Sequence, residues 1–285
     1  MKDELKQLQV MGNLAEAYAQ ISSLRMKRTR NSVLQARSFL ADLNDLFSDV
    51  LAAYRRKVTE LLRKKGSKRG GEVTLLAHNG KTVRVFLSAN TGLYGDVMKK
   101  TFQKFMADVR EFNDEITIVG KTGRALYVSN PIKPEYTYFD FPDTKIDREM
   151  LAKVTNHLVQ YEKIIVYHGK FVNIIRQDAV SDVVSAGNPL ESAANDKSRQ
   201  AEYLFEPSLE DILRFFETEI FASTLEQAVR EHQLSKHASR VLAMDRASNN
   251  ISEALKKLRL KDLQIAHKKK NRKQLNSLSS MLVWH

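Results

Sequence analysis

The sequence contains no cysteine, so a disulfide, a thiolate metal site and a cysteine nucleophile are all excluded. This absence fits a reducing compartment. No stretch approaches the ~18 apolar residues of a membrane-spanning helix, so we expect none. The opening residues, MKDELKQLQV, are charged and have no apolar centre, so we expect neither a secretory signal nor a transit peptide.

Glycine and proline are scarce at both ends of the chain. Gly12 is the one glycine before Gly66, no proline precedes Gly66, and neither residue follows Pro207. Because glycine and proline interrupt helices and strands, the two ends are expected to hold longer uninterrupted elements than the middle. We expect three parts: an N-terminal coiled-coil helix over 1–68, an α/β domain over 72–200 and a C-terminal coiled-coil helix over 205–285.

The N-terminal end carries apolar residues at alternating steps of four and three. They are Ala36, Leu40, Leu43, Phe47, Val50 and Tyr54, and Leu5, Leu8 and Met11 begin a similar stripe. This heptad spacing keeps one apolar face against a partner helix. The segment SKRGG at 67–71 is predicted to follow the end of this helix.

The C-terminal end has a helix start signal in Ser208 and Asp211, an S-x-x-D pattern whose side chains can satisfy free N–H groups. Its seam is Val241, Met244, Ser248, Ile251, Leu255, Leu258, Asp262 and Ile265. A helix from 208 to about 282 would be roughly 110 Å long and needs a partner along its length. We therefore expect the two ends to pair as an antiparallel coiled coil.

The middle of the chain alternates strand and helix patterns. Strands are predicted at 73–77, 83–88, 116–120, 163–168 and 172–177, and helices at 95–111 and 146–161. This alternation favours a Rossmann-like α/β domain with a largely parallel sheet. Residues 184–200 are small and polar and are predicted to form a loop.

The sequence has few motifs that are typical of catalysis or of ligand binding. The loop TGLYG at 91–95 follows a strand, as many phosphate-binding loops do, but it is neither a P-loop nor a dinucleotide fingerprint. The GKT letters in 119–126 lack the upstream glycine, so a turn is expected there. The histidines show no metal-binding spacing and are interpreted as surface or packing residues. We expect no catalytic residue, no metal and no cofactor.

The formal net charge of +12 points to an acidic partner. One basic segment runs from Arg25 to Arg30, and residues 256–273 hold nine Lys or Arg against one acid, Asp262. Such segments suit a solvated helix face, an electrostatic docking surface or phosphate binding on nucleic acid. Little aromatic interleaving argues against stacking on single strands.

Residues 203–260 resemble the γ subunit of the F-type ATP synthases. That family reads close to Y-[IL]-[FY]-E-P-[SD] and then S-E-x-A-A-R-M-x-A-M-x-x-A-[TS]-x-N-A-x-x-[LI]-I-x-x-L. The chain follows these runs at Tyr203, Leu204, Phe205, Glu206, Pro207, Ser208, Ser235, His237, Ala238, Arg240, Ala243, Met244, Ala247, Ser248, Asn250, Leu255 and Leu258. The loop SANTGLYGD is similar to the family's S-x-D-R-G-L-C-G and shares Ser88, Gly92, Leu93 and Gly95.

The resemblance implies a non-catalytic central-stalk rotor that couples ion-driven rotation of the c-ring to the catalytic β subunits. Its coiled coil would insert into the ring of α and β subunits, and its α/β domain would sit with ε on the c-ring. The implied place is the cytoplasmic face of a bacterial plasma membrane, peripheral and without a membrane span. An α/β domain of this family holds no nucleotide, so TGLYG is expected to be a structural turn. We expect no nucleic acid among the partners.

The resemblance also assigns residues. Contacts with β subunits are expected from Arg25, Lys27, Arg28, Arg30, His267, Lys268 and Arg272, and structural roles from Gly92, Gly95, Glu206, Pro207, Arg240, Met244 and Asn250. The chain departs from the family at Asn90, Thr91 and Tyr94, where Asp, Arg and Cys are usual, and throughout 261–275. A basic coiled-coil protein that binds nucleic acid and a paralogous rotor with an altered role stay open as alternatives.

Overall fold

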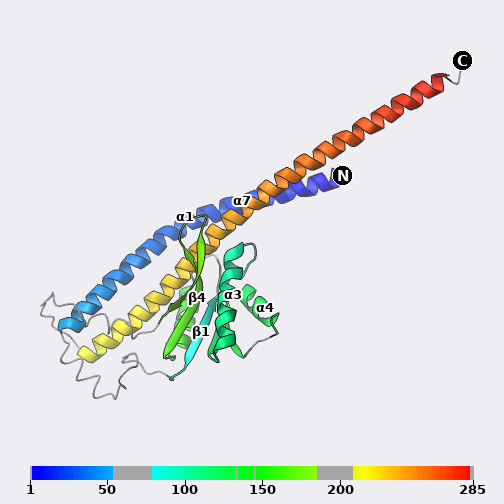
Figure 1. Cartoon of the computed structure of the whole chain (residues 1–285). Coiled ribbons are helices and arrows are strands. Elements are labelled where there is room, and N and C mark those ends of the chain that lie inside the picture. The colour runs from blue at the N-terminus through cyan, green and yellow to red at the C-terminus, as the bar shows by residue number, and fades with distance from the viewer. Residues whose placement is uncertain (1, 54–78, 132–133, 144–145, 185–207, 283–285) are drawn as a thin grey trace. The chain divides into compact units, whose positions relative to one another are not determined.

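The computed structural model describes residues 2–53, 79–131, 134–143, 146–184 and 208–282 (Figure 1). The chain forms two compact units. Residues 1–24 with 240–285 make the coil unit, and residues 25–239 make the sheet unit. Helices α1 (Lys2–Ala53) and α7 (Leu209–Leu282) contribute to both. The domain boundaries expected near 68, 72, 200 and 205 all fall outside the described residues and stay predictions.

The long helix predicted for each end is confirmed. Helix α7 begins where its cap predicts: the Ser208 hydroxyl oxygen accepts the Asp211 N–H at 3.2 Å, and the same hydroxyl donates to the Asp211 carboxylate at 2.6 Å. These bonds satisfy groups that the first helical turn leaves without intrahelical partners.

The sheet unit holds a five-stranded sheet. Its strands are β1 (Thr82–Leu87), β2 (Glu115–Val119), β3 (Tyr136–Phe139), β4 (Lys163–Phe171) and β5 (Gln177–Val183), in the order β3-β2-β1-β4-β5. Among the described strands only β4 and β5 pair antiparallel, so the sheet is largely parallel as predicted. Helices α3 (Asp96–Glu111), α4 (Lys121–Val128) and α5 (Arg148–Leu158) alternate with the first four strands.

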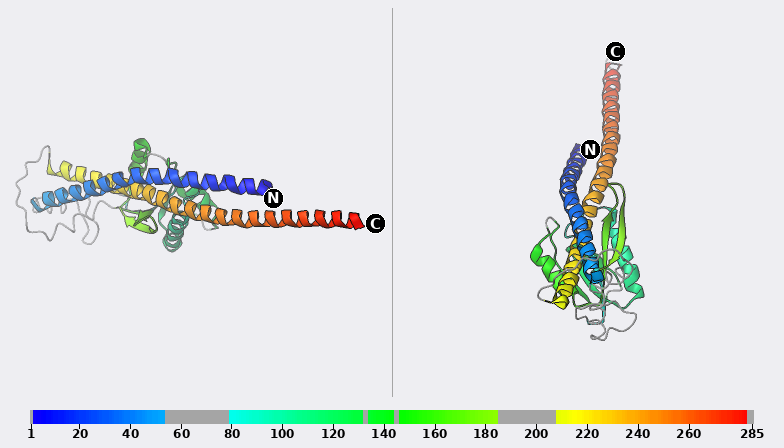
Figure 2. Two further views of the ribbon diagram at one scale, coloured as in Figure 1. Left: turned by 90° about the horizontal axis from the view of Figure 1, so that it is seen from above. Right: turned by 90° about the vertical axis from the view of Figure 1, so that its left-hand side faces the viewer.

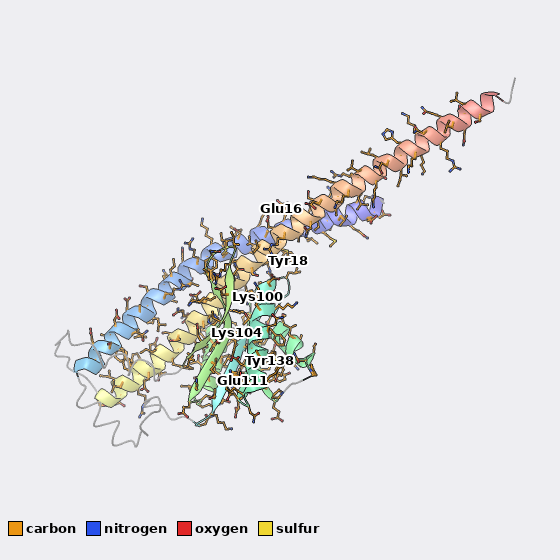
Figure 3. The ribbon with its side chains drawn as sticks, in the orientation of Figure 1. Glu16, Tyr18, Lys100, Lys104, Glu111 and Tyr138 are labelled. Atoms are coloured by element: carbon orange, nitrogen blue, oxygen red, sulfur yellow. The ribbon has the colours of Figure 1, made fainter. Side chains whose placement is uncertain are left out.

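Each face of the sheet has its own apolar core, because alternate strand residues point to opposite sides. On one face, Val83 and Val85 of β1 lie in a cluster with Leu158 of α5 and Leu225 of α7. On the other face, Phe86 lies with residues of α3 and α4, among them Phe105 and Tyr127. Lys104 of α3, labelled in Figure 3, also donates to the Ala179 carbonyl of β5 at 3.5 Å.

Within the sheet unit, α1 and α7 run antiparallel. The rings of Phe47 and Phe216 lie 5.3 Å apart between centroids, and the Arg37 Nε atom donates to the Glu231 carboxylate at 2.6 Å. The predicted stripe residues Ala36, Leu40 and Leu43 are half-buried. Tyr54, the last of the stripe, lies outside the described residues.

The coil unit continues the antiparallel pairing, with α1 beside α7 in both views of Figure 2. The guanidinium of Arg240 lies 5.8 Å from the Tyr18 ring centroid, and a Cβ built on Gly12 would lie 3.4 Å from an Ile251 methyl group. The α7 seam is confirmed from Val241 to Asp262, all buried or half-buried.

Two seam predictions are wrong. Met11 is 55% exposed, and the half-buried Gly12 takes its place in the seam. The α1 seam then passes through Ala15, Ala19 and Ser22, small residues that an apolar count overlooks. Ile265 of α7 is 45% exposed, so the seam ends at Asp262.

The strand predicted at 172–177 is also wrong. The Asn173 side chain accepts the N–H groups of Ile175 and Arg176 at 2.9 and 2.7 Å, which closes an Asx-type turn between β4 and β5. Strands β3 and β5 and helix α4 were not predicted; α4 takes the place of the turn expected at GKT. The strand predicted at 73–77 and most of the loop at 184–200 lie outside the described residues.

Candidate functional site

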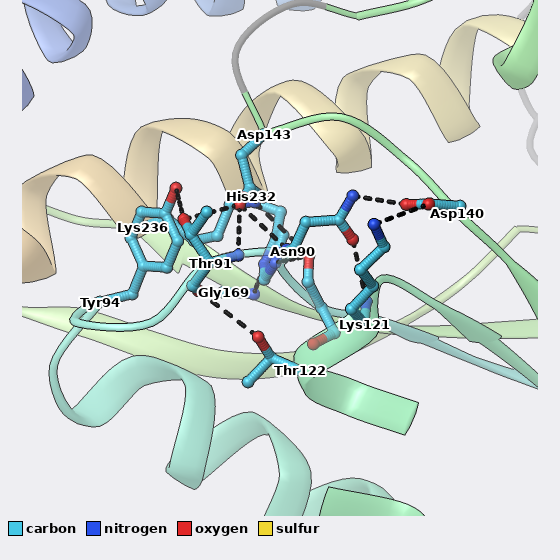
Figure 4. A network of polar contacts seen from close by, with 11 residues as sticks. Asn90, Thr91, Tyr94, Lys121, Thr122, Asp140, Asp143, Gly169, His232 and Lys236 are labelled. Atoms are coloured by element: carbon cyan, nitrogen blue, oxygen red, sulfur yellow. Dashed lines mark hydrogen bonds and ion pairs between the residues drawn. The ribbon is translucent and has the colours of Figure 1, made fainter. Parts of the chain in front are cut away.

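The main polar site lies at the carboxyl end of β1, where the chain order of the strands changes direction. Strand β1 pairs with β2 on one side and with β4 on the other. In open α/β sheets this switch point is where ligands usually bind. Here α7 fills it with Lys236 and His232, as Figure 4 shows. We call this set, with Asp143 and the loop after β1, the α7 junction.

The loop after β1 binds an anion, and the anion is the chain's own Asp143. One carboxylate oxygen of Asp143 accepts the N–H groups of Asn90 and Thr91 at 2.9 and 2.8 Å and the Thr91 hydroxyl at 2.9 Å. Backbone N–H groups that converge in a turn form an anion-binding nest. The loop therefore does what a phosphate loop does, for an internal carboxylate.

Lys236 of α7 neutralises that carboxylate. Its Nζ atom lies 2.8 Å from the second Asp143 oxygen, and both side chains are at least 94% buried. The same ammonium lies 3.4 Å from the Ser88 carbonyl oxygen and 5.2 Å from the Tyr94 ring centroid. Burial on its own would raise the pKa of Asp143, but the Lys236 charge and the hydrogen bonds from Lys236 and Thr91 outweigh it and lower that pKa.

His232 ties α7 to both central strands. Its Nδ1 atom accepts the Gly169 N–H at 3.0 Å, so its other nitrogen, 3.2 Å from the Ser88 carbonyl oxygen, carries the proton and donates. The imidazole is therefore neutral. Complete burial, with the nearby charges of Lys236 and His168, lowers the pKa of His232 well below its ordinary value.

The rim of the junction joins the loop to α4 and to the segment after β3. The Asn90 side chain donates to the Asp140 carboxylate and accepts the Lys121 N–H at 2.9 Å. The Lys121 ammonium lies 3.3 Å from Asp140. Three connections at the carboxyl end of the sheet are thus held together around the Asp143 carboxylate.

The junction has a structural role, because the side chains of Asp143, Lys236 and His232 already have hydrogen-bond or ion-pair partners within this chain. A general acid or base needs access to a substrate proton, and the ion pair of Asp143 and Lys236 is buried on both sides. Among the described residues, no group of three or more His, Cys, Asp or Glu side chains could hold a metal ion. The arrangement therefore suits a structural role, in which a buried ion pair and the two hydrogen bonds of His232 hold α7 against the sheet.

A second polar cluster lies beside a cavity of about 410 Å³ between α1, α7 and the last two strands. His168, only 1% exposed, has its Nε2 atom 2.9 Å from the Asp182 carboxylate, and its Nδ1 atom 3.2 Å from the Gly169 carbonyl oxygen. Glu231 lines the same cavity and is 3% exposed. Through Glu231, which accepts the Arg37 Nε–H at 2.6 Å, this side of α7 is joined to α1.

The residues expected to contact β subunits form two separate sets. Arg25, Lys27, Arg28 and Arg30 lie on α1 in the sheet unit; Arg25 is half-buried and the other three are exposed. His267, Lys268 and Arg272 lie on α7 in the coil unit and are exposed. Their contacts stay a prediction.

The residues expected to be structural lie in three places. Gly95 precedes α3 with φ of +66°, a conformation that favours glycine, whereas a Cβ on Gly92 would meet nothing within 4 Å. Arg240 and Met244 are buried, and Asn250 is exposed. Glu206 and Pro207 lie outside the described residues.

Sequence reasoning missed the two charges of the junction, Asp143 and Lys236, and the bridging role of His232. Three signals pointed there. Asn90, Thr91 and Tyr94 depart from the family loop, and each has a contact in or beside the junction. For Asp143 the sequence offers no signal, since it lies 52 positions from Thr91 and belongs to no motif.

The comparisons with known proteins agree on one family. The family described as ATP synthase matches residues 1–264. The ATP synthase gamma chain of Desulforamulus reducens is 24% identical over 267 residues, which cover 91% of this chain and 89% of the relative. The ATP synthase gamma chain of Malacoplasma penetrans is 24% identical over 271 residues, covering 91% and 90%.

Solved structures share the fold. The central stalk and c-ring structure of the Tetrahymena thermophila mitochondrial ATP synthase contains a chain that aligns with a TM-score of 0.55 at 18% identity, covering 82% of this chain and 99% of that one. A chain of the Euglena gracilis mitochondrial ATP synthase aligns with a TM-score of 0.53 at 16% identity, covering 91% and 94%. With the family match along nearly the whole sequence, these findings show that the chain belongs to the ATP synthase γ-chain family.

Proposed function

We propose that this chain is the central-stalk rotor subunit of an F-type ATP synthase and has no catalytic site of its own. It would turn with a c-ring and bias each catalytic β subunit in turn among its conformations. Such coupling needs only contacts that differ between states, so no chemistry in this chain is required.

The α7 junction is the observation that carries this proposal. A rotor must pass torque from the domain that is turned to the helix that acts. The buried ion pair of Asp143 and Lys236 and the His232 bridge join α7 to loops and strands of the sheet. Removing one partner of such a buried pair costs about 3–5 kcal/mol, because the other charge is left buried without its counter-ion.

The proposed partners are α and β subunits around the coiled coil, and ε and the c-ring at the α/β domain. Arg28 and Arg30 are exposed on α1 and would face acidic surfaces of β, as would Lys268 and Arg272 on α7. No described helix could cross a membrane. We propose a peripheral place on the cytoplasmic face of a bacterial membrane, reached through the c-ring.

The test is purification of the tagged chain from its native membranes, with identification of co-purifying chains and assay of magnesium-dependent ATP hydrolysis. Recovery of α-, β- and ε-like chains with ATPase activity is expected. Recovery of the chain alone, or with nucleic acid, would overturn the proposal and favour the basic coiled-coil alternative.

The basic residues of α1 are tested in the same preparation. Charge reversal in R28E/R30E should slow or uncouple ATP hydrolysis, because repulsion replaces attraction at the β surface. The matched control R28K/R30K keeps both charges and should stay coupled. Unchanged coupling in R28E/R30E would exclude these two residues from the contact.

A further inference from the structure

Helix α7 is held in the sheet unit by two stretches of opposite character. Between Asp211 and Arg230 the buried side chains are apolar except for Glu217; the apolar ones are Leu213, Phe216, Ile220, Phe221, Leu225, Ala228 and Val229. Between Glu231 and Ser239 every residue is buried, yet only Leu234 and Ala238 are apolar. We call the first the apolar stretch and the second the polar stretch.

The two stretches differ in how much apolar packing holds them. The apolar stretch supplies Phe221 and Leu225 to the core that includes β1 and α5, whereas neither core cluster of the described residues includes a residue of the polar stretch. In the polar stretch the Gln233 Nε2 and Ser235 Oγ atoms are buried without a hydrogen-bond partner among the described residues, which costs free energy. Because segments with few apolar contacts open most easily, the polar stretch is the part of this attachment that can open by itself.

The hydrogen bonds of His232, in the polar stretch, require a neutral ring. Its Nδ1 atom accepts the Gly169 N–H at 3.0 Å, and its Nε2 atom lies 3.2 Å from the Ser88 carbonyl oxygen; Figure 4 shows the ring beside Gly169. A proton on Nδ1 would set two donors against each other. Protonation of His232 therefore removes the hydrogen bond between α7 and β4.

The charged groups around His232 do not stabilise its protonated form. The charges of Lys236 on α7 and His168 on β4 both favour the neutral ring, and complete burial acts in the same direction, so the pKa of His232 lies well below its ordinary value. The carboxylates on the surrounding elements are already paired: Asp143 with Lys236, Asp182 with His168 and Glu231 with Arg37.

His168 responds to acid in the opposite way. Its two ring nitrogens both lie against oxygen atoms, Nδ1 3.2 Å from the Gly169 carbonyl oxygen and Nε2 2.9 Å from the Asp182 carboxylate. Because an imidazolium donates from both nitrogens, protonation of His168 keeps both contacts. Of the two histidines, acid therefore removes the one that attaches α7 and keeps the one that joins β4 to β5.

We propose that His232 is an acid-sensitive switch, whose protonation releases the polar stretch of α7 from β1 and β4 while the apolar stretch and the sheet stay folded. The released ring binds a proton below its ordinary pKa of about 6.5, whereas the buried ring does not. The ratio of open to closed molecules then rises about tenfold per pH unit below that value, until the pKa of the buried ring is reached. The switch lies within this chain; in the proposed rotor it would loosen the joint between α7 and the sheet in acid.

The test is hydrogen exchange, read at single residues by mass spectrometry, on the chain as recovered from its native membranes, between about pH 7.5 and pH 5.5. Each rate is divided by the intrinsic rate at that pH to give a protection factor. The Gly169 N–H reports on the switch because His232 accepts it, and its protection should fall about tenfold per pH unit below about 6.5. Ile118 of β2, fully buried and paired with β1 and β3, reports on the sheet and should stay more strongly protected than Gly169 at every pH.

Two variants assign the effect to one group. H232Q introduces an amide that can accept and donate as the neutral ring does but does not titrate, so the protection of Gly169 should no longer fall in acid. H157Q is the matched control, because burial also lowers the pKa of His157 but its Nε2 atom lies 3.2 Å from the Thr117 hydroxyl oxygen on β2. H157Q should keep the full pH dependence at Gly169.

The outcomes decide the switch separately from the rotor. Protection of Gly169 that does not change with pH, or that equals the protection of Ile118 at every pH, overturns the switch, since α7 and the sheet would then open together or not at all. A pH dependence that survives in H232Q or disappears in H157Q overturns it as well. If H232Q does not fold, the comparison of Gly169 with Ile118 in the parent chain and in H157Q still decides. The chains that co-purify test the rotor, so either proposal can fail alone.

Discussion

Two stretches of the same helix have opposite surroundings. From Glu231 to Ser239, the run EHQLSKHAS, every residue of α7 is buried, although all but the leucine and the alanine are polar or charged. From Leu263 to Ser279 every residue is exposed, although Leu and Ile recur. Composition alone would assign the first stretch to water, yet it is buried.

The difference shows that a residue on a long helix is buried when other parts of the fold pack over it, whatever its own hydrophobicity. In the buried stretch three ionisable side chains have partners: Lys236 has Asp143, His232 has Gly169 and Ser88, and Glu231 has Arg37. The Gln233 Nε2 and Ser235 Oγ atoms have no hydrogen-bond partner among the described residues, so the burial of this stretch leaves some polar atoms unsatisfied. Buried polar groups are tolerated when they are hydrogen-bonded. From Leu263 to Ser279 no other part of the described chain covers the helix, so even its leucines stay exposed.

The largest expected loss of stability comes from removing one charge of the buried pair, which tests whether the buried stretch depends on its partners. K236M leaves the Asp143 carboxylate buried without its cation, and the sheet unit should lose about 3–5 kcal/mol of unfolding free energy. Urea denaturation followed by circular dichroism measures this loss.

The double variant K236M/D143N is the matched control. The side-chain amide introduced by D143N would still accept the N–H groups of Asn90 and Thr91 but would carry no charge, so most of the lost stability should return. A double variant as unstable as the sum of its single variants would show that the pair does not act as a pair.

The second way is to crowd the contact between α7 and β4. A Cβ on Gly169 would lie 2.6 Å from the Ser235 hydroxyl oxygen and 2.7 Å from a Val97 methyl group. G169A should therefore cost about 1–3 kcal/mol, the usual range for overpacking. G92A is the control, since a Cβ there meets nothing within 4 Å, and it should change the unfolding free energy by less than about 0.5 kcal/mol.

Much of the architecture is predictable because it follows from periodicity. The heptad steps predict both long helices and their antiparallel pairing, and the Ser208 cap predicts the start of α7 to one residue. The turn after β4 resembles a strand in sequence, because Ile174 and Ile175 are typical strand residues, while the Asn173 side chain closes the turn.

The junction is not predictable from local pattern, since its groups come from distant parts of the chain. Even so, residues that depart from the family runs lie there. Lys236 stands where the run S-E-x-A-A-R has an acid, and Thr91 stands where the loop S-x-D-R-G has a base. In this chain the cation is Lys236 on α7 and the carboxylate is Asp143. Positions at which the chain departs from the family motif therefore indicated the site better than positions at which it matches the motif.

A third test of the buried stretch of α7 is the dependence of stability on pH. Because the fold lowers the pKa of His232, the unfolded chain binds a proton near pH 6.5 that the folded chain does not. Stability should therefore fall as pH drops below about 6.5, by about 1.4 kcal/mol per pH unit for one such group, until the folded pKa is reached. His157, whose pKa burial also lowers, contributes in the same direction.

The variant H232Q separates the two histidines. It lacks the group that titrates at the junction, so its stability between about pH 7 and pH 5 should depend less on pH than that of the parent chain, whatever its absolute stability. An unchanged slope in H232Q would assign the whole effect to His157 or to other groups.

A smaller change concerns the seam of the coil unit. Ser22 is fully buried, and its hydroxyl has no hydrogen-bond partner among the described residues. S22A removes that hydroxyl and keeps the small size that the seam needs, so the coil should gain up to about 1 kcal/mol. S22L should destabilise it by overpacking. Thermal unfolding of both variants measures the difference.

The smallest effect on the isolated chain is expected in the exposed segment from Leu263 to Ser279. Lys269 has no covered side, so K269A should change the unfolding free energy by no more than about 0.5 kcal/mol, and loss of the like-charge pair with Lys273 favours a slight gain. K236A, a substitution of the same type on the same helix, should lose several kcal/mol. If K269A proved as costly as K236A, exposure would not distinguish the two stretches of α7, and the comparison between them would fail.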